Sequence, residues 1–509
     1  MVDAREYHER SKHSPQSVRD TDWTLDFDNK PRPSKVYTDL PRLSLGEPVN
    51  PPDAPALSAV ATSRPSPDRV GDPATGTGLA ELCHYAAGVT KTLEIRGEQA
   101  SFRAASCTGK LYHIDLYAVT GDLDDADPGV YQYDPESDEF HVLREGDFRG
   151  VLAAASGGQQ GVADAPVTLV ATSTWWRNSW KYRDRTYRHA FWDSGTVLAN
   201  LLAVAHGAGY RAEVVAGFAD EPVVELLGID PEWEAPLELV AVGADDPAPA
   251  PGSVEHIDPA IEVASDPVEF PLIHDAWDQS TLADGETAEA WREGFADATA
   301  ADCGTHAPGA GDLVQLDPVD DETASARPVG NTIERRGSLR EYSHEPISDR
   351  KLATILDRAL RGVPTDCFGR GAPDSLLDYY VLVHAVEGVP SGAYQYHPGE
   401  NALERVGDTG RQEAAYLALG QEVVGDAAVN VYAMADVDAV VEHVGNRGYR
   451  LAQLEGGIAL GRLYLATYAH RALGGRGFTF YDDLVSEHLS PRASNQTPMT
   501  LFAFGKPEQ

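Results

Sequence analysis

Cysteine, lysine and long apolar runs are all scarce in this chain of 509 residues. Its 4 cysteines are far apart and contain no C-x-x-C pair, so we expect reduced thiols rather than a disulfide framework. His84, His113 and His189 lack ligand spacing, so no metal site is predicted. No segment approaches the roughly 18 apolar residues that span a bilayer, and the opening MVDAREYHERSKHSPQSVRD has no apolar signal core. The sequence therefore predicts a soluble, cytoplasmic protein.

Basic residues are also few. The chain has 80 Asp and Glu against 41 Lys and Arg, which gives a formal net charge of -39. Such a surface repels phosphate backbones and anionic lipid, which argues against nucleic acid and membranes as partners. It also repels itself, and salt screening relieves that repulsion. The composition thus resembles that of proteins from extreme halophiles.

Two compact segments separated by linkers account for most of the chain, in keeping with the two or three domains that its length predicts. Residues 1–75 are rich in Pro, Ser and Asp and are predicted to form an extended N-terminal segment. Residues 242–330 form an acidic Pro/Ala-rich linker, in which IHDAWDQSTLADGETAEAWREGF has helical spacing. The predicted domains are therefore residues 76–241 and 331–509.

The two predicted domains are copies of each other. Three matches occur in the same order and at a nearly constant distance along the chain, which indicates a duplicated domain. They are GVYQYDP at Gly129 with GAYQYHP at Gly392, RTYRHAFWDSG at Arg185 with RGYRLAQLEGG at Arg447, and FADEPVVELLG at Phe218 with FYDDLVSEHLS at Phe480. Two such copies are expected to form a pseudo-dimer within one chain, and further oligomerisation is left open.

Each copy is predicted to have an α+β fold. A helix comes first, then apolar strands such as LYHIDLYAVT and LLDYYVLVHAV, then a long helix and a last strand (LELVAVG; MTLFAFGKP). On the long helices, Arg188 and Asp193 lie close to one turn apart, as do Arg450 and Glu455. We expect each pair to interact, because features repeated in both copies favour architecture over chemistry.

Two motifs, one in each copy, could form a single composite site. In IERRGSLREYSHEPIS, Arg336, Ser338 and Arg340 combine two guanidinium forks with a hydroxyl, a set that can hold a phosphate. A solvated surface cluster is the alternative. The first copy has FRAASCTGKLYHIDLY instead, whose small residues let backbone amides approach a flat ligand. These residues are Ala104, Ala105, Ser106, Thr108 and Gly109, flanked by Arg103 and Tyr112.

Together with HYAAGVT, WWRNSWKYRDRTYRHAFWDSGTVLANLLAVA and RRGSLREYS, these motifs make the chain resemble the SagB-type (ThcOx-like) dehydrogenases, tandem members of the FMN-dependent nitroreductase family. The resemblance covers nearly the whole chain. It implies two nitroreductase-like domains with FMN bound at their interface.

The resemblance also implies roles for particular residues. Arg336, Ser338 and Arg340 would grip the FMN phosphate and ribityl chain. The loop of the first copy would pack on the isoalloxazine, although it reads S-C-T-G-K-L-Y-H where the family has P-S-A-G-x-L-Y-P. Its flavin-binding residues would be Arg103, Ser106, Thr108 and Gly109, joined by Gly475 and Gly477 from ALGGRGFTF. Gly474 is instead expected to cap a helix.

Members of this family that act in azole-peptide biosynthesis oxidise azoline rings with the help of a Lys-Tyr pair, which Lys181 and Tyr182 match here. Aromatisation sends a hydride to the flavin and a proton to a base, so a base near the flavin is required. Nearby cations are expected to lower the pKa of both side chains. These cations are Arg177, Arg183, Arg185 and Arg188. The alternative is that Lys181 merely pairs with a surface carboxylate.

The sequence thus favours an FMN-dependent oxidoreductase that acts on a small molecule or a peptide, in its narrower form an azoline dehydrogenase acting on a ribosomal peptide. Two alternatives stay open. One is an NAD(P)H-dependent nitro- or quinone reductase, because one fold can host both directions of flavin chemistry. The other is a non-catalytic peptide-binding module, against which the intact Arg336, Ser338 and Arg340 set speaks.

Overall fold

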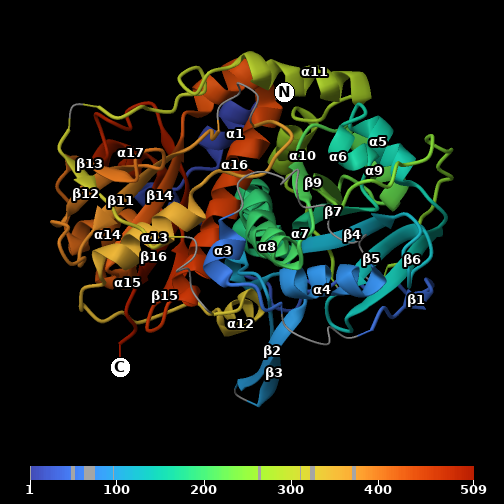
Figure 1. Cartoon of the computed structure of the whole chain (residues 1–509), viewed down its shortest axis with the longest axis horizontal. Helices are drawn as coiled ribbons and strands as arrows, with labels where there is room; N and C mark the ends of the chain where they lie inside the picture. Colours follow the sequence, from blue (N-terminus) through green and yellow to red (C-terminus); the bar gives the residue numbers. More distant parts are fainter. Residues whose placement is uncertain are drawn as a thin grey trace.

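Two halves, each built on a large antiparallel sheet, lie side by side in the computed structural model (Figure 1). The structure describes residues 2–46, 52–61, 75–95, 97–261, 265–309, 311–320, 327–368 and 374–508. Parts of the predicted N-terminal segment, of the acidic linker and of the stretch TDCFGRGAPDS fall outside these ranges. Within the described residues, no helix combines the length and apolar character needed to cross a membrane.

The two sheets have the same strand order. In the first half the order is β1 (Arg42–Leu43), β6 (Glu139–Glu145), β5 (Gly129–Asp134), β4 (Ile114–Thr120), β7 (Val167–Thr174), β9 (Glu234–Val242) and β8 (Ala212–Val215). In the second it is β10 (Leu313–Gln315), β13 (Ala402–Gly407), β12 (Gly392–His397), β11 (Asp378–Val383), β14 (Val429–Ala435), β16 (Thr497–Gly505) and β15 (Gly474–Phe478). The α+β tandem fold predicted from the sequence is confirmed.

The edge strands β1 and β10 come from the segments that the sequence predicted to lie outside the domains. β1 belongs to the N-terminal segment and pairs with β6, and β10 belongs to the acidic linker and pairs with β13. Each sheet therefore recruits one strand from beyond the predicted domain limits.

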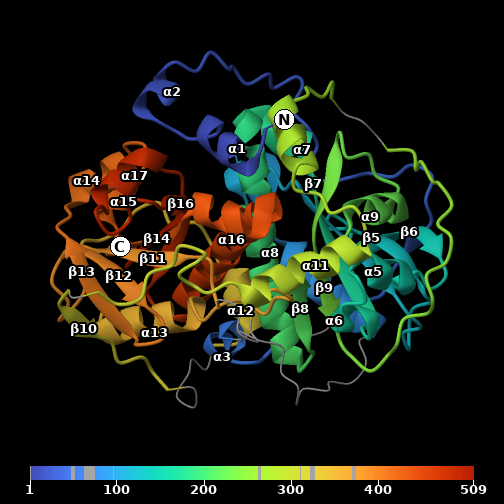
Figure 2. The ribbon, with the colours of Figure 1, turned by 90° about the horizontal axis from the view of Figure 1, so that it is seen from above.

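Two long helices lie between the sheets at the centre of the molecule (Figures 1 and 2). They are α8 (Thr186–Ala208) in the first half and α16 (Val437–Ala469) in the second, and nearly every residue of α8 is buried. α16 bends at Gly445, whose φ of +68° suits a residue without a β-carbon. These helices form the interface of the predicted pseudo-dimer.

Shorter helices surround this centre. The first half carries α4 (Gly76–Ala87), α5 (Arg149–Ala155), α6 (Gln160–Ala163), α7 (Trp175–Tyr182) and α9 (Asp220–Leu227), with 3-10 turns at Thr108–Lys110 and Arg183–Arg185. The second half carries α12 (Val329–Arg335), α13 (Asp349–Ala359), α14 (Arg411–Leu417), α15 (Glu422–Asp426) and α17 (Asp482–His488). A hairpin of β2 (Val89–Ile95) and β3 (Glu98–Arg103) projects from the first half (Figure 1).

The N-terminal segment wraps around both halves. It contains α1 (Ala4–Arg10), α2 (Pro15–Arg19) and α3 (Ala56–Val60), and α1 packs against α16. Further on, the Trp23 indole donates to the carbonyl of Trp180 at 3.0 Å, and the Trp180 indole donates to the carbonyl of Asp26 at 2.8 Å. The segment thereby covers α7.

The acidic linker is helical where the sequence predicted. It forms α10 (Pro271–Asp278) and α11 (Gly285–Asp297), which pack against α8 and α16 respectively. The Trp291 indole on α11 donates to the carbonyl of Val444 at 2.8 Å. The linker therefore also ties the halves together.

The predicted pairing of Arg188 with Asp193, and of Arg450 with Glu455, is wrong. Residues five positions apart point to different sides of a helix, so neither pair meets. Instead Arg188 Nη1 lies 2.6 Å from Asp482 Oδ1 in the opposite half. Likewise, Arg450 of the second half pairs with the first half: its Nη1 lies 2.8 Å from Asp220 Oδ1. The repeated arginines therefore join the halves to each other.

Candidate functional site

The structure brings the two predicted half-sites into contact. Arg336, at the C-terminal end of α12, donates from Nε to the carbonyl of Ala104 at 2.9 Å. Its Nη2 donates to the carbonyls of Arg103 and Ala105 at 2.9 and 3.1 Å. The guanidinium also lies 5.7 Å from the ring centroid of Tyr464 on α16. Arg336 of the second half thus holds the small-residue loop of the first.

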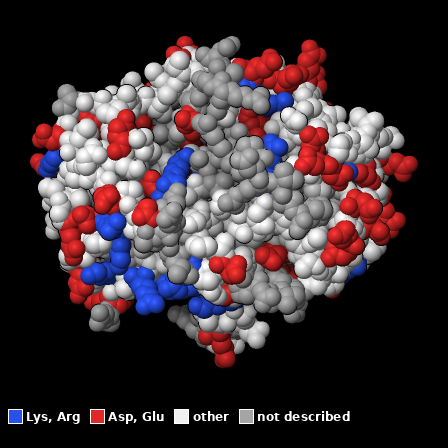
Figure 3. All heavy atoms as spheres, viewed as in Figure 1, with Lys and Arg blue, Asp and Glu red and all other residues white. Residues whose placement is uncertain are grey.

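Ser338 and Arg340, the rest of the predicted phosphate-binding motif, are exposed. Within the described part of the chain neither side chain has a hydrogen bond or an ion pair. The amide of Leu339 between them donates to the carbonyl of Gly475 at 3.3 Å, which lays the motif beside β15. Figure 3 shows Lys and Arg side chains gathered around β15 and α12 on this face of an otherwise acidic protein. A hydroxyl and a guanidinium are therefore available to an anion.

The glycines of ALGGRGFTF are strand residues. Gly474 begins β15, after α16 has already ended, so the expectation that it caps a helix is wrong. A β-carbon on Gly475 would lie 2.3 Å from the Phe502 ring, so packing within the sheet already requires this glycine. Gly477 is half-buried, and its amide donates to Tyr464 Oη at 2.7 Å. Both predicted glycines thus lie in the strand that borders the predicted phosphate-binding motif.

The small-residue loop of the first half has an unusual backbone. Gly109, Lys110 and Tyr112 all have positive φ, at 64°, 59° and 49°, a region that side-chain-bearing residues rarely adopt. The Arg103 amide donates to Tyr112 Oη at 3.2 Å, and the Arg103 guanidinium lies 4.9 Å from the Tyr112 ring centroid. The loop is therefore held in one shape by its own side chains.

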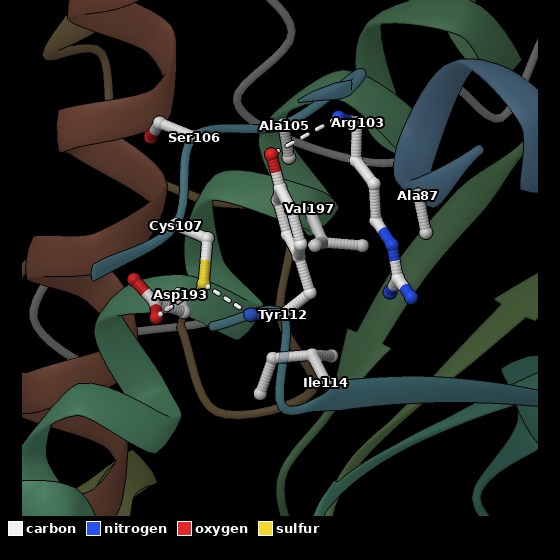
Figure 4. Close-up of a pocket in the computed structure, with 9 residues that line it drawn as sticks. All are labelled: Ala87, Arg103, Ala105, Ser106, Cys107, Tyr112, Ile114, Asp193 and Val197. Atoms are coloured by element: carbon white, nitrogen blue, oxygen red, sulfur yellow. Dashed lines mark hydrogen bonds between the residues drawn. The ribbon is translucent and has the colours of Figure 1, made fainter. Parts of the chain in front are cut away.

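A small pocket opens beside this loop (Figure 4). Its lining residues are Ala87, Arg103, Ala105, Ser106, Cys107, Tyr112, Ile114, Asp193 and Val197. Arg103 stands at one end of the pocket and Cys107 with Asp193 at the other, with Tyr112 between them. The Nε of Arg103 is buried and has no hydrogen-bond partner within the described residues. A buried donor without an acceptor fits a polar or anionic ligand.

Thr108 and Ser106 fix the loop to α8. The amide and hydroxyl of Thr108 donate to Asp193 Oδ1 at 2.9 and 2.8 Å. The hydroxyl of Thr196 donates to the carbonyl of Ser106 at 2.6 Å. The Thr108 hydroxyl is therefore already engaged, whereas Ser106 also lines the pocket.

The predicted catalytic pair ends α7. Lys181 is exposed, and its Nζ lies 5.0 Å from the Tyr182 ring centroid. The alternative of a carboxylate partner is not seen, because no described residue forms an ion pair with Lys181. Tyr182 reaches the loop, since a β-carbon on Gly109 would lie 2.7 Å from Tyr182 Oη. The pair thus borders the first-half loop.

The pKa values of the pair shift for other reasons than the sequence suggested. Lys181 is exposed overall, but partial desolvation of its amine lowers the pKa of the side chain, with no contribution from neighbouring charges. Burial and the nearby Asp193 carboxylate raise the pKa of Tyr182, so the predicted lowering is wrong. Three of the cations invoked are neutralised elsewhere: Arg177 Nη1 lies 2.9 Å from Asp115, and Arg185 and Arg188 both pair with Asp482. Tyr182 is therefore a neutral phenol, able to donate a hydrogen bond.

Sequence reasoning missed Tyr464 and Arg476, and it assigned Asp193 to a pair with Arg188 and not to the site. Tyr464 contacts both Arg336 and Gly477, and Asp193 receives the loop. Arg476 on β15 is close enough to Tyr182 to oppose the rise in its pKa. Tyr464 and Asp193 lie in helices whose apolar spacing predicts only a buried face, so no local signal distinguishes them.

Comparison with known proteins agrees with this architecture. Residues 87–244 match the model of the nitroreductase family, so the first half is a nitroreductase-family domain. A nitroreductase-like protein of Methanocaldococcus jannaschii is 29% identical over 168 residues, which cover 32% of this chain and 80% of that protein. The microcin B17-processing protein McbC of Escherichia coli is 28% identical over 134 residues, 25% of this chain and 49% of McbC.

The fold extends beyond the matched half. A solved nitroreductase-like protein of Anabaena variabilis superposes with a TM-score of 0.72 and 23% identity, covering 99% of both chains. At that identity the likeness concerns the fold alone. It embraces both halves, so the whole chain has a tandem nitroreductase-like fold.

Proposed function

We propose that this chain is an FMN-dependent oxidoreductase that binds one FMN between its two halves. The observation that carries the proposal is the contact of Arg336 with the carbonyls of residues 103–105, which joins the two motifs of the composite site. Bound FMN would supply hydride transfer at its N5 atom. The chain's own residues would bind it, orient it and handle protons.

The phosphate end would be held by the second half. Ser338 and Arg340 are exposed and have no partner within the described residues, and Arg336 uses only Nε and Nη2 on the loop carbonyls. Charge-assisted hydrogen bonds from guanidinium groups suit phosphate oxygens. The ring end would lie against the first-half loop, where the buried Nε of Arg103 has no acceptor among the residues that the structure describes.

The narrower form of the proposal is the oxidation of azoline rings in a ribosomal peptide. Its support is the match to the microcin B17-processing protein McbC and the Lys181–Tyr182 pair beside the loop. A lowered pKa increases the fraction of Lys181 present as free amine, the form that accepts the proton when the ring becomes aromatic. The neutral hydroxyl of Tyr182 would orient the substrate by donating a hydrogen bond.

An NAD(P)H-dependent nitro- or quinone reductase is the second candidate. It is favoured by the nitroreductase-like relative of M. jannaschii, of which 80% is matched. The two candidates differ in the source of the hydride. Anaerobic bleaching of the flavin by NADH or NADPH would support the reductase, and bleaching by an azoline-bearing peptide would support the dehydrogenase.

Flavin binding is the first test. The chain purified in high salt should be yellow or become yellow with added FMN, and titration should reach one FMN per chain. Arg340→Ala should weaken FMN binding by about 10-fold to 100-fold, the worth of a hydrogen bond to a charged group. The exposed Arg350→Ala on α13 is the matched control and should bind FMN as the parent does. A folded, colourless chain that refuses added FMN would refute the proposal.

A further inference from the structure

We propose that Cys107, His113 and Asp193 form a binding site for a divalent transition metal of the zinc class at the end of the pocket lined by Cys107 and Asp193. Cys107 Sγ lies 3.1 Å from Asp193 Oδ2, and His113 Nε2 lies 2.9 Å from the same oxygen. The sulfur, the nitrogen and the carboxylate oxygen all lie within 4.8 Å of one another. Three ligand atoms of different chemistry thus converge on one point.

The three groups are also held by partners outside the cluster, and the Thr108 amide reaches both oxygens of Asp193 at 2.9 Å. His113 Nδ1 lies 2.8 Å from Ser173 Oγ, and Asp193 Oδ1 accepts from the amide and hydroxyl of Thr108. Cys107 Sγ accepts the amide hydrogen of Tyr112 at 3.0 Å, a contact that stabilises a thiolate. Outer hydrogen bonds of this kind orient ligands at protein metal sites.

The ligand set favours zinc. Thiolate, imidazole and carboxylate are the ligands that Zn²⁺ takes, usually in tetrahedral geometry. Metal–ligand bonds of about 2.0–2.3 Å require the ligand atoms to stand roughly 3.3–3.5 Å apart, so the present contacts would open by a few tenths of an ångström. Cys107 and Asp193 line the pocket, so the fourth position faces it.

Metal binding must also account for the protons that Cys107 and His113 carry. The Cys107 thiol would release its proton to solvent on becoming a thiolate. His113 would carry its remaining proton on Nδ1 and donate it to Ser173 Oγ, which frees Nε2 for the metal. No oxidant or reductant is involved.

The second half shows that the carboxylate has an architectural role of its own. Glu455, the counterpart of Asp193, accepts from the Leu376 amide at 2.9 Å and from the Ser375 hydroxyl, so it too holds the loop before its first long strand. The only such Cys/His/carboxylate cluster among the described residues is in the first half. A carboxylate on the long helix therefore anchors the loop in both halves. Cys107 and His113 occur beside it in the first half only, and anchoring the loop does not require them.

The sequence argued against a metal because it has no C-x-x-C pair and its histidines lack ligand spacing. Cys107 and His113 flank a loop with three positive-φ residues, and Asp193 comes from α8. The folded loop, which brings both Cys107 and His113 within hydrogen-bond distance of Asp193 Oδ2, creates the cluster.

The test measures metal binding by the full chain, with readouts that do not depend on bound flavin. After removal of metal with a chelator, titration with Zn²⁺ in competition with a chromophoric chelator should give one tight site per chain. Co²⁺ should give tetrahedral absorption bands and a thiolate charge-transfer band. Cys107→Ser should abolish that band and weaken Zn²⁺ binding at least 10-fold, as should His113→Gln.

The matched control is Cys367→Ser. Cys367 is also a buried thiol beside a carboxylate, with its Sγ 3.3 Å from Asp366 Oδ1, but it belongs to no such cluster in the described residues. It should retain the Co²⁺ spectrum and the Zn²⁺ affinity. Thermal unfolding of each variant identifies any that fail to fold. Absence of stoichiometric Zn²⁺ and Co²⁺ binding by the parent chain, or equal loss in the Cys107 and Cys367 variants, would overturn the proposal.

Discussion

Gly195 of α8 and Gly457 of α16 lie against each other at the centre of the molecule. A β-carbon on Gly195 would be 2.4 Å from the carbonyl carbon of Gly457, and one on Gly457 would be 2.4 Å from the carbonyl oxygen of Phe191. The two glycines are equivalent positions of the duplicated sequence. The halves therefore meet through a symmetric backbone contact that no larger residue permits.

Gly457→Ala should separate the two helices and destabilise the chain. The added methyl group would meet backbone atoms, which cannot rotate away, and overpacking in a buried interface typically costs about 1–3 kcal/mol. Urea unfolding monitored by fluorescence measures this loss. Gly294→Ala is the control: Gly294 lies in α11, where among the described residues no atom outside the helix's own backbone lies within 4 Å of the new β-carbon. It should be neutral or stabilising by about 0.5–1 kcal/mol, because alanine favours a helix over glycine.

Asp482→Asn and Asp220→Asn should each destabilise the pseudo-dimer. Each carboxylate is buried and pairs with two arginines of the opposite half. Neutralising it leaves those arginines buried without a counter-ion, which costs about 3–5 kcal/mol. Asp483→Asn is the control, since Asp483 is exposed and pairs with Lys12. It should change the free energy of unfolding by about 1 kcal/mol or less. Equal effects at Asp482 and Asp483 would contradict the role assigned to the buried network.

The long elements could be predicted because their signal is local. The apolar spacing of α8 and the apolar runs of β7 and β14 depend only on neighbouring residues, and the repeat indicated the second half from the first. Strands β1 and β10 could not be found in this way. They have only a few residues each, and they are strands because a sheet edge is next to them in space.

The candidate site was predicted in composition but not in its contacts. That Arg336 and the loop at Arg103 belong together followed from each copy having one motif that the other lacks. The partners of Arg188 and Asp193 did not follow, because Asp482 and Thr108 are far from them along the chain. Helical spacing indicates which side chains share a face, and the opposing surface decides which of them meet.

Glu238 should make stability fall as the pH rises. Burial raises its pKa to about 8, against which the hydrogen bond from Ser194 acts only in part. The native state therefore keeps a proton that the unfolded state loses above about pH 4.5, so stability decreases between about pH 4.5 and 8. Glu238→Gln should remove this dependence, and its stability relative to the parent should improve from pH 5 to pH 9 by about 2–5 kcal/mol.

Urea unfolding at pH 5, 7 and 9 measures the Glu238 effect. Glu293→Gln on the exposed surface of α11 is the control and should run parallel to the parent chain at all three pH values. The prediction would be contradicted if the free energy of unfolding of the parent chain fell no more steeply from pH 5 to pH 9 than that of Glu238→Gln.

Added KCl should raise the melting temperature. The net charge of -39 makes the folded chain repel itself, and Figure 3 shows acidic side chains over much of one face. At 1 M salt the Debye length is about 3 Å, so most of this repulsion is screened by then. Calorimetry from 0.1 to 3 M KCl measures the rise. Sorbitol at matched osmolality separates screening from solvent exclusion, and a melting temperature indifferent to KCl would refute the halophilic interpretation.

Lys181→Ala should leave FMN bound but slow the reduction of the flavin by substrate. Lys181 is exposed and forms no hydrogen bond or ion pair with Arg336, Ser338 or Arg340, the predicted phosphate-binding residues, so the affinity for FMN should stay within about two-fold. Loss of a general base typically costs about 100-fold or more in the chemical step. Stopped-flow bleaching of the flavin by an azoline-bearing peptide measures it. Tyr182→Phe should retain the base and lose less.

The pH profile separates a base at Lys181 from a merely structural lysine. In the parent chain the rate should rise with pH as the amine of Lys181 loses its proton. The midpoint should lie below the ordinary pKa of lysine because the amine is partly desolvated. Lys181→Ala should lose this rise of the rate with pH, and an added primary amine should restore part of the rate. Lys91→Ala, an exposed lysine on β2, should keep the full profile. Two results would show that Lys181 does not act as the base: loss of FMN from Lys181→Ala, or an unchanged reaction rate and pH dependence in that variant. A proton acceptor should be needed for proton transfer and not for cofactor binding.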